Sequence, residues 1–304
     1  MRKKTLKPSA HVYTLIIFSM IFWGISFVWT RIALGELQPI ALVFIRLVSS
    51  SAILLIGLKL INKLEFIKKE DLKHFLIASF FNPFLYFLGE TFGIKYTSPI
   101  ISAVLISTIP VFTPVAAFLI LKERLTILNI LGLFISFFGV LVMLGFQSGS
   151  DGNSIIGILC LLFAVSAAIA YSIKLKRLSS TYGPFSIVAW QNMIGSLMFL
   201  PFFLIFDLNS TLSAAFSAKV LGSIILLVVF ASSLAFIFYT KVNSILGVSR
   251  TAVFTNFIPV FTALFSWMIL DEELSLQKAT GMALVIGGVF LTQIKGFNLK
   301  LGSR

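Results

Sequence analysis

The feature that most constrains this chain is an internal repeat: residues 99–143 recur without a gap as residues 248–292. The two copies are identical at 14 of 45 aligned positions, and both contain Ile-Pro-Val-Phe-Thr, at 109–113 and at 258–262. Both copies are apolar, and each carries its proline in the middle of the apolar run. A duplicated apolar unit interrupted at matching positions is typical of transporters that bind substrate where two repeats meet.

The chain is also far more apolar than a soluble protein needs to be. Of its 304 residues, 58% are hydrophobic and 12% are charged, and the mean hydropathy is +1.04. Apolar runs near 20 residues in length, separated by short polar breaks, predict membrane-spanning helices. The fold class that we predict is therefore an all-α integral membrane protein. Its ten predicted spans are 12–31, 39–60, 75–95, 98–121, 127–146, 155–174, 184–206, 219–240, 248–270 and 277–294.

The distribution of lysine and arginine predicts the orientation of these spans. With the N-terminus inside, 19 of these residues fall in cytoplasmic segments and 4 in outer segments, which predicts a cytoplasmic N-terminus and C-terminus. Ten spans divide into two five-helix repeats, 12–146 and 155–294, and an odd number of helices per repeat makes the two halves inverted. The basic segment 122–125 is then inside, whereas its acidic counterpart 271–274 is outside.

Other classes of protein fit this sequence poorly. The net charge of +13 reflects cations at helix ends, as the positive-inside rule requires, so no nucleic acid is expected as a partner. His11, His74 and the single cysteine, Cys160, have no partners at metal-ligand spacing, so neither a metal nor a cofactor is expected. The same scarcity disfavours a lipid-modifying membrane enzyme, and no phosphate-binding loop indicates ATP use.

Several short motifs occur in order through both halves. The first half has Trp23-Gly24, Arg46 within 43–47, Tyr96-Thr97-Ser98, a proline-containing segment that ends in Leu-Lys-Glu-Arg-Leu at 121–125, Gly132 and Gly139; the second half has Ile258-Pro259, Leu-Asp-Glu-Glu-Leu at 270–274, Gly281 and Gly288. This ordered set resembles the EamA family of the drug/metabolite transporter superfamily and covers nearly the whole chain. The resemblance implies a multi-pass inner-membrane exporter or importer of amino acids or other small metabolites. Of these we expect an exporter of amino acids.

Two charges stand clearly inside predicted spans, where a charged side chain is costly and usually functional. Arg46 and Glu90 each lie about 10 Å from the outer end of their helices at 1.5 Å per residue. Their equal depth permits an ion pair between them. Glu90 is equally a candidate for binding substrate or carrying a proton.

Polar residues around Glu90 suggest a site. Asn82, Tyr86 and Glu90 recur every four residues, which places them on one face of a regular helix. Three intramembrane positions carry hydrogen-bonding side chains in both halves, which suggests that they surround a common binding site. The alternative is that such groups only join helices to one another. The matched pairs are Arg46 with Gln191, Glu90 with Tyr239, and Ser107 with Asn256.

Pro110 and Pro259 each remove a backbone donor and free a carbonyl one turn earlier. Beside Ser107 and Asn256, such carbonyls could bind an ammonium or a carboxylate, although the prolines also suit a simple kink for packing or gating. Aromatic side chains supply apolar walls. The candidate substrate-binding residues are Trp23, Asn82, Tyr86, Glu90, Ser107, Pro110, Tyr171, Gln191, Tyr239, Asn256 and Pro259, with Glu90 and Arg46 as the proton-coupling or ion-paired groups.

We therefore expect a secondary transporter that works by alternating access, with a small-molecule substrate, protons and the lipid bilayer as its partners. A proton-independent facilitator of other metabolites fits the sequence as well. A channel or a membrane scaffold is the alternative outside transport by a carrier. The oligomeric state is not specified by the sequence, and a monomer is compatible with it.

Overall fold

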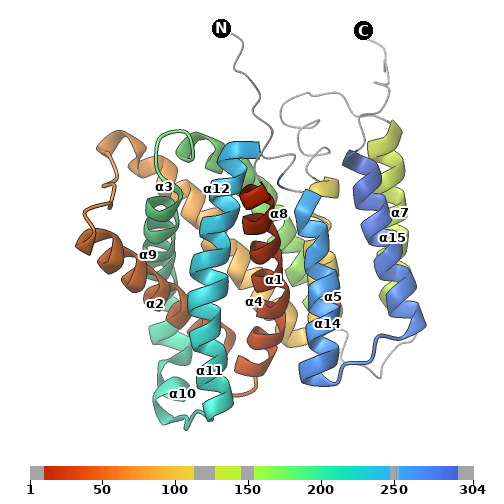
Figure 1. Cartoon of the computed structure of the whole chain (residues 1–304). Helices are drawn as coiled ribbons and strands as arrows, with labels where there is room; N and C mark the ends of the chain where they lie inside the picture. Colours follow the sequence, from red (N-terminus) through yellow and green to blue (C-terminus); the bar gives the residue numbers. More distant parts are fainter. Residues whose placement is uncertain (1–9, 113–126, 145–153, 247–250, 252, 294–304) are drawn as a thin grey trace, which may run out of the picture.

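The computed structural model of this chain describes residues 10–112, 127–144, 154–246, 251 and 253–293. Within these ranges the chain forms helices and turns, without a strand, as predicted (Figure 1). The later part of the predicted span 98–121 and the 121–125 motif lie outside the described residues. The start of the first helix and the end of the last lie at the same end of the bundle (Figure 1).

Six helical segments in the described part of the chain are long and apolar enough to cross a membrane. Each coincides with a predicted span: Ala10–Ala33, Pro39–Leu60, Lys69–Tyr96, Ile155–Ser172, Pro184–Ser213 and Ala218–Leu246. The other four predicted spans correspond to shorter apolar helices, Pro99–Phe112, Ile130–Val142, Phe254–Leu270 and Leu276–Leu291. The all-helical character is thus confirmed, while the number of spans and their direction across a membrane stay predictions.

The helices follow one another in the predicted order, and several begin where the sequence has a proline, which fits the first turn of a helix. The first half contains α1 (Ala10–Ala33), α2 (Pro39–Leu60), η1 (Lys69–Asp71), α3 (Leu72–Ser79), η2 (Phe80–Leu85), α4 (Tyr86–Tyr96), α5 (Pro99–Ile106) and α7 (Ile127–Leu144). The second half contains α8 (Ile155–Leu178), α9 (Pro184–Phe202), η3 (Phe203–Asp207), α10 (Leu208–Ser213), α11 (Ala218–Leu226), η4 (Leu227–Ala235), α12 (Phe236–Leu246), η5 (Val253–Phe257), α14 (Ile258–Leu270) and α15 (Leu276–Gln293).

Three of the long spans contain a π-helical segment, η2, η3 or η4, and two of these segments, η2 and η4, lie at matching positions. η2 separates α3 from α4, and η4 separates α11 from α12; shifting η2 by the repeat distance places it inside η4. Within η2, Asn82 has extended backbone angles (φ −146°, ψ 117°) and precedes Pro83, which has no N–H. The four-residue stripe predicted for this helix is therefore wrong at Asn82, because regular helical spacing begins only at Tyr86.

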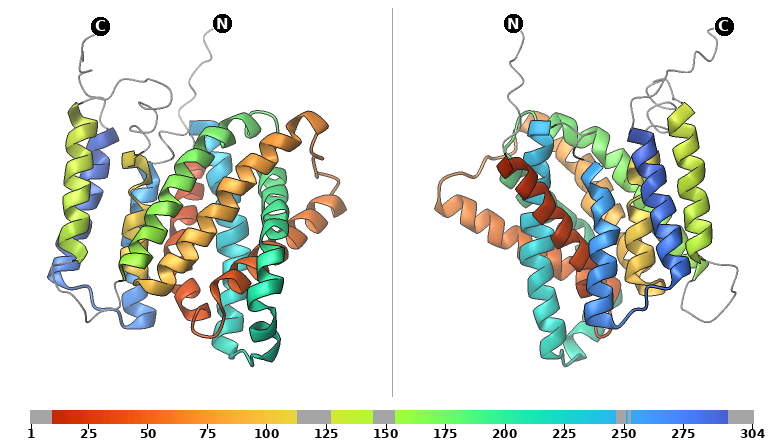
Figure 2. Two further views of the ribbon diagram at one scale, coloured as in Figure 1. Left: turned by 180° about the vertical axis from the view of Figure 1, so that it is seen from behind. Right: turned by 45° about the vertical axis from the view of Figure 1, so that its right-hand side comes forward.

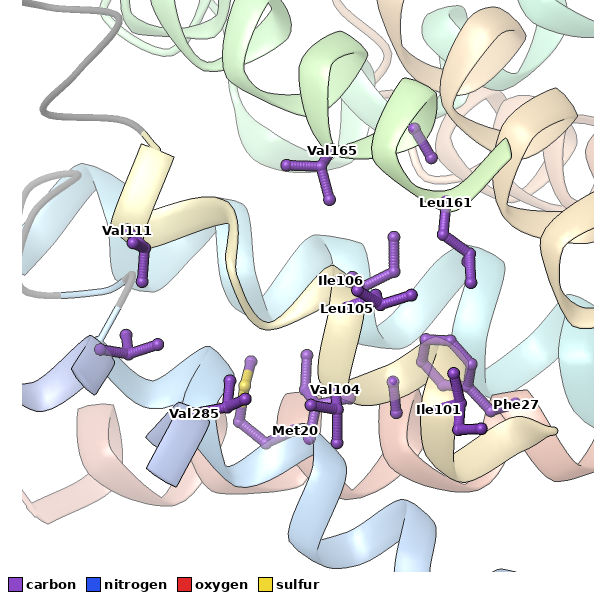
Figure 3. Packing of buried hydrophobic residues seen from close by; sticks show 14 of the residues in the cluster. Met20, Phe27, Ile101, Val104, Leu105, Ile106, Val111, Leu161, Val165 and Val285 are labelled. Carbon is purple, nitrogen blue, oxygen red and sulfur yellow. The ribbon is translucent and has the colours of Figure 1, made fainter. Parts of the chain in front are cut away.

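The main hydrophobic core joins both halves of the chain. Side chains from α1, α5, α8 and α15 converge in it, as Figure 3 shows for Met20, Leu105, Leu161 and Val285, all of them at most 2% exposed. Burial of such side chains gives about 1.5–3 kcal/mol each where water is the reference. In a bilayer the close fit between helices matters more, since lipid is as apolar as the core.

Glycines allow α7 and α15 to approach each other closely. These two helices lie side by side at one edge of the bundle, next to α5 and α14 (Figures 1 and 2). A Cβ atom on Gly139 would lie 2.8 Å from the Gly281 carbonyl oxygen, and one on Gly288 would lie 2.6 Å from the Gly132 carbonyl oxygen. The close-packing roles predicted for Gly139 and Gly288 are confirmed, and the atoms that their Cβ atoms would meet include the carbonyl oxygens of Gly281 and Gly132. The same role predicted for Gly287 is wrong, because a Cβ there would meet nothing within 4 Å.

α2 and α9 pack in an antiparallel manner through two contacts. Asn192 Nδ2 donates to Ser50 Oγ at 2.8 Å, and a Cβ on Gly195 would lie 3.4 Å from Leu47 Cδ1. The repeat relates Ser50 to Gly195 and Leu47 to Asn192, and the residues of each pair are 145 positions apart. Exchanging each residue for its counterpart therefore converts the Asn192–Ser50 contact into the Leu47–Gly195 contact. The Gly139–Gly281 and Gly288–Gly132 contacts exchange in the same way at a separation of 149, so the packing between these helices follows the sequence repeat.

Candidate functional site

Arg46 lies two turns into α2 and is 3% exposed. Its Nε donates to Ser232 Oγ at 3.2 Å, and its guanidinium carbon lies 4.7 Å from the centre of the Phe87 ring. Its Nη1 is buried and has no hydrogen-bond partner. The predicted direct ion pair between Arg46 and Glu90 is not formed, although the two charges interact electrostatically. Elsewhere in the described residues, Lys278 and Glu272 form an ion pair.

Glu90 is bound from within its own helix. The Tyr86 hydroxyl donates to Glu90 Oε1 at 2.8 Å, which is the contact expected for residues four apart in α4. Glu90 is 7% exposed, so the carboxyl group lies in the protein interior, as predicted for a functional acid. Asn82 is also buried, but it lies in η2 and does not continue this face.

Aromatic rings connect the two halves near Arg46. Phe87 of α4 contacts Phe236 of α12 with ring centres 6.2 Å apart, and the Trp23 ring of α1 lies 5.0 Å from both Phe236 and Tyr239. Trp23 and Tyr239 pack against the main core yet are only partly buried. These rings leave part of their surface available for contact with another molecule.

The second half contributes a tyrosine and an amide. Tyr171 Oη of α8 donates to Gln191 Oε1 of α9 at 3.1 Å, and both side chains are buried. The Gln191 Nε2 group has no hydrogen-bond partner.

The proline positions interrupt helices as predicted. α5 ends at Ile106, just before the turn that precedes Pro110, and Pro259 lies in the first turn of α14 after the 3₁₀ segment η5. Ser107 donates to the Val104 carbonyl of its own helix at 2.7 Å. Asn256, its counterpart, is 2% exposed and neither its Oδ1 nor its Nδ2 has a partner.

Sequence reasoning missed a buried polar network beside Arg46. Asn192 Nδ2 donates to Ser50 Oγ at 2.8 Å and to the Ser232 carbonyl at 3.0 Å. Ser50 Oγ also lies 2.7 Å from Ser233 Oγ. A signal was present, since Ser50 and Ser232 each belong to a run of serines inside an apolar span, but serine is common in membrane helices and only the fold brings these residues together.

Carboxylates at both ends of the α2–α9 pair bind helix starts. At one end Glu65 Oε2 accepts from Gly183 N, which precedes α9, at 2.6 Å. At the other end Asp207 Oδ2 accepts from Ala41 N of α2 at 2.8 Å, and Glu36 Oε2 accepts from Ser217 N at 2.8 Å. The hydrogen bond from the Ser217 backbone lowers the pKa of Glu36. Negative charge at a helix N-terminus is favourable, so these contacts stabilise both ends.

The described residues contain no group of three or more His, Cys, Asp or Glu side chains that could hold a metal ion. Cys160 is a free, half-buried thiol in α8. The candidate site therefore consists of hydrogen-bonding and aromatic side chains, which suit reversible binding of a small molecule.

Known proteins resemble this chain along nearly all of its length. An uncharacterized transporter of Archaeoglobus fulgidus is 26% identical over 279 residues, which cover 92% of this chain and 97% of that protein. The uncharacterized transporter YetK of Bacillus subtilis is 28% identical over 296 residues, covering 95% and 89% of the two chains. One solved crystal structure has a TM-score of 0.66 at 14% identity and covers 93% of this chain and 96% of that chain, which shows a shared fold.

The profile of the EamA-like transporter family matches residues 11–145 and 155–294. Together with the apolar helices, this match identifies a multi-pass membrane protein that transports small molecules. The chain belongs to the EamA-like transporter family.

Proposed function

We propose that this chain is a secondary transporter that moves small carboxylate-bearing metabolites, and amino acids in particular, across the inner membrane. The observation that carries the proposal is a pair of buried donors without partners, Arg46 Nη1 and Gln191 Nε2. They occupy counterpart positions in α2 and α9. An unsatisfied buried donor costs about 1–3 kcal/mol, and more when it is charged, so a ligand that supplies an acceptor is favoured there.

The surroundings of these donors suit a zwitterion. Glu90, which accepts a hydrogen bond from the Tyr86 hydroxyl, can also accept one from the ammonium group of an amino acid, or can carry a proton. Trp23 and Tyr239 are partly buried and can cover the carbon skeleton of the substrate. An acid, a base and an apolar wall in one region are what recognition of an amino acid requires.

Two observations support alternating access by inverted halves. The contacts between α2 and α9, and between α7 and α15, exchange when the halves are exchanged. Interrupted helices also recur at matching positions, as η2 and η4 do. The excess of lysine and arginine on one side supports a cytoplasmic N-terminus and C-terminus, and the family resemblance supports export.

Uptake into proteoliposomes tests this function. A panel of labelled amino acids is offered with and without an imposed pH gradient to the wild type, Arg46→Gln and Glu90→Gln. We expect saturable, gradient-driven transport of at least one amino acid, loss of that transport in Arg46→Gln, and transport insensitive to the gradient in Glu90→Gln. Glu36→Gln is the matched control, since Glu36 is an exposed carboxylate in an outer turn.

Each outcome discriminates between functions. Transport that ignores both the gradient and Glu90→Gln indicates a proton-independent facilitator. Transport that survives Arg46→Gln unchanged rejects Arg46 as the carboxylate site. If the wild type moves no amino acid, the proposed substrate class is wrong, and neutral metabolites become the next panel.

A further inference from the structure

We propose that Ser232 and Asn192 are positioning residues that hold the Arg46 guanidinium so that Nη1 faces the substrate's carboxylate. The inference rests on the proposed role of Arg46 and deepens it. It assigns the preference for a carboxylate to a network of three helical segments, α2, α9 and η4, and not to Arg46 alone.

The first step is the restraint on Arg46 itself. An arginine side chain has several rotatable bonds, and a buried guanidinium can turn toward any nearby acceptor. Here the Nε group is bonded to Ser232 Oγ at 3.2 Å, and the Phe87 ring lies 4.7 Å from the guanidinium carbon. These two contacts restrain the position of the group. Nη1 is buried and has no hydrogen-bond partner in the described part of the chain, so a carboxylate that reached it would supply the acceptor it lacks.

The second step is the restraint on Ser232. Its carbonyl oxygen accepts from Asn192 Nδ2 at 3.0 Å and from Ser50 Oγ at 3.2 Å. Asn192 Nδ2 and Ser50 Oγ are themselves 2.8 Å apart, so the three groups form a closed set. η4 is π-helical at this point, so its hydrogen-bond pattern differs from that of an α-helix. The side chains of Ser50 and Asn192 add a restraint on Ser232 from α2 and α9.

The third step separates positioning from simple helix packing. The repeat relates the Ser50–Ser232 contact to a contact between Gly195 of α9 and Pro83 of η2, where a Cβ on Gly195 would overlap the proline ring. An apolar contact is thus sufficient to join the helices there. The polar version occurs where α2, α9 and η4 meet beside Arg46, and the guanidinium there needs an acceptor. Hydrogen bonds between membrane helices contribute only about 0.6 kcal/mol on average to stability. Stabilising the contact between these helices is therefore a weak reason for the network to be polar.

The experiment compares acids with their amides. Binding of the standard amino acids and of the corresponding amino-acid amides is measured by thermal stabilisation of the purified full chain, and competition with labelled uptake gives relative affinities. We expect Ser232→Ala and Asn192→Ala to reduce the wild-type preference for acid over amide by roughly tenfold, the effect of one lost oriented hydrogen bond to a charged group. Ser232→Thr, which keeps the hydroxyl, should preserve the preference.

Ser196→Ala is the matched control. Ser196 is a buried serine on α9, and its hydroxyl bonds only to the Met193 carbonyl of its own helix, at 2.7 Å. The positioning role is overturned if Ser232→Ala binds acids and amides with equally reduced affinity. It is also overturned if Ser232→Ala lowers only the melting temperature and leaves the acid-to-amide ratio unchanged. If Ser232→Ala does not fold, Asn192→Ala decides by the same ratio. An acid preference that survives Arg46→Gln overturns the proposed function instead.

Discussion

At the scale of single residues, Asn256 offers a direct test of whether an unpartnered polar group serves function at the expense of stability. Its amide is buried in η5 with neither polar atom bonded. We predict that Asn256→Leu, which has nearly the same shape, raises the free energy of unfolding by about 1–2 kcal/mol, because an unsatisfied amide is removed from an apolar environment. Substrate transport should fall in the same variant.

Thermal unfolding in detergent and proteoliposome uptake measure the two effects. Asn192→Leu serves as the contrasting variant, since it removes an amide that makes two hydrogen bonds and should lower stability by about 1 kcal/mol. A loss of stability in Asn256→Leu would show that the amide is satisfied in the protein, and the prediction would then be wrong.

Sequence reasoning identified residues whose type is unusual inside an apolar span. Arg46 and Glu90 were found because a charge in a membrane helix is costly, and both are buried in the fold. Ser50 and Ser232 were not found because each is individually unremarkable as a membrane-helix residue. Their significance depends on a contact between segments more than 180 residues apart, which no local pattern records.

At the scale of elements, the α7–α15 contact should tolerate no side chain at two of its glycines. We predict that Gly139→Leu and Gly288→Leu each destabilise the protein by roughly 1–3 kcal/mol, because the added atoms would meet the backbone of the facing helix. Gly287→Leu is the control on the same helix, where a Cβ meets nothing within 4 Å, and it should be neutral or stabilising. Thermal unfolding of the three variants tests this, and equal losses in all three would contradict the packing argument.

The contact between Glu36, which follows α1, and Ser217, which precedes α11, should respond to acid. Hydrogen bonding to Ser217 N lowers the pKa of Glu36 below its ordinary value of 4.5. The contact is therefore fully present above that ordinary value and is lost as the pH falls through the lowered value. We predict that the Ser217 amide is protected from hydrogen exchange at neutral pH, that this protection is lost as the pH falls below 4.5 and through the lowered pKa of Glu36, and that Glu36→Gln has reduced protection at neutral pH. Equal protection in both proteins would show that the carboxylate contributes nothing.

The boundaries of most helices follow from the apolar runs, while their internal geometry does not. α2 begins and ends where its span was predicted, because Pro39 begins it and the basic segment after Leu60 ends the apolar run. The π-helical segments η2 and η4 were not predicted, since hydropathy is blind to a local change in hydrogen-bond pattern. Pro83 was a hint for η2, but η4 has no proline at all.

At the scale of the whole molecule, the predicted orientation can be tested with single cysteines. Replacing Cys160 by alanine gives a background without thiols, in which Lys63→Cys and Ala215→Cys place one thiol at either end of the bundle, both at exposed positions. We predict that a membrane-impermeant maleimide added to intact cells labels Ala215→Cys and leaves Lys63→Cys unlabelled until the membrane is permeabilised. The reverse pattern would show that the N-terminus is outside.

Two contacts beside the α2–α9 pair are related by the repeat but differ in chemistry, and this difference has an energetic consequence. If the halves exchange roles during transport, a molecule with identical halves would spend equal time facing each side of the membrane. Here Ser50 of α2 is hydrogen-bonded to Asn192 of α9 and to Ser232 of η4, whereas the counterpart contact, between Gly195 of α9 and Pro83 of η2, is apolar. Exchanging roles then does not restore the same energy, and each 1.4 kcal/mol of difference shifts the resting population tenfold. The carrier without substrate should therefore rest mainly facing one side of the membrane, and the polar contact of Ser50, Asn192 and Ser232 should contribute to which side that is.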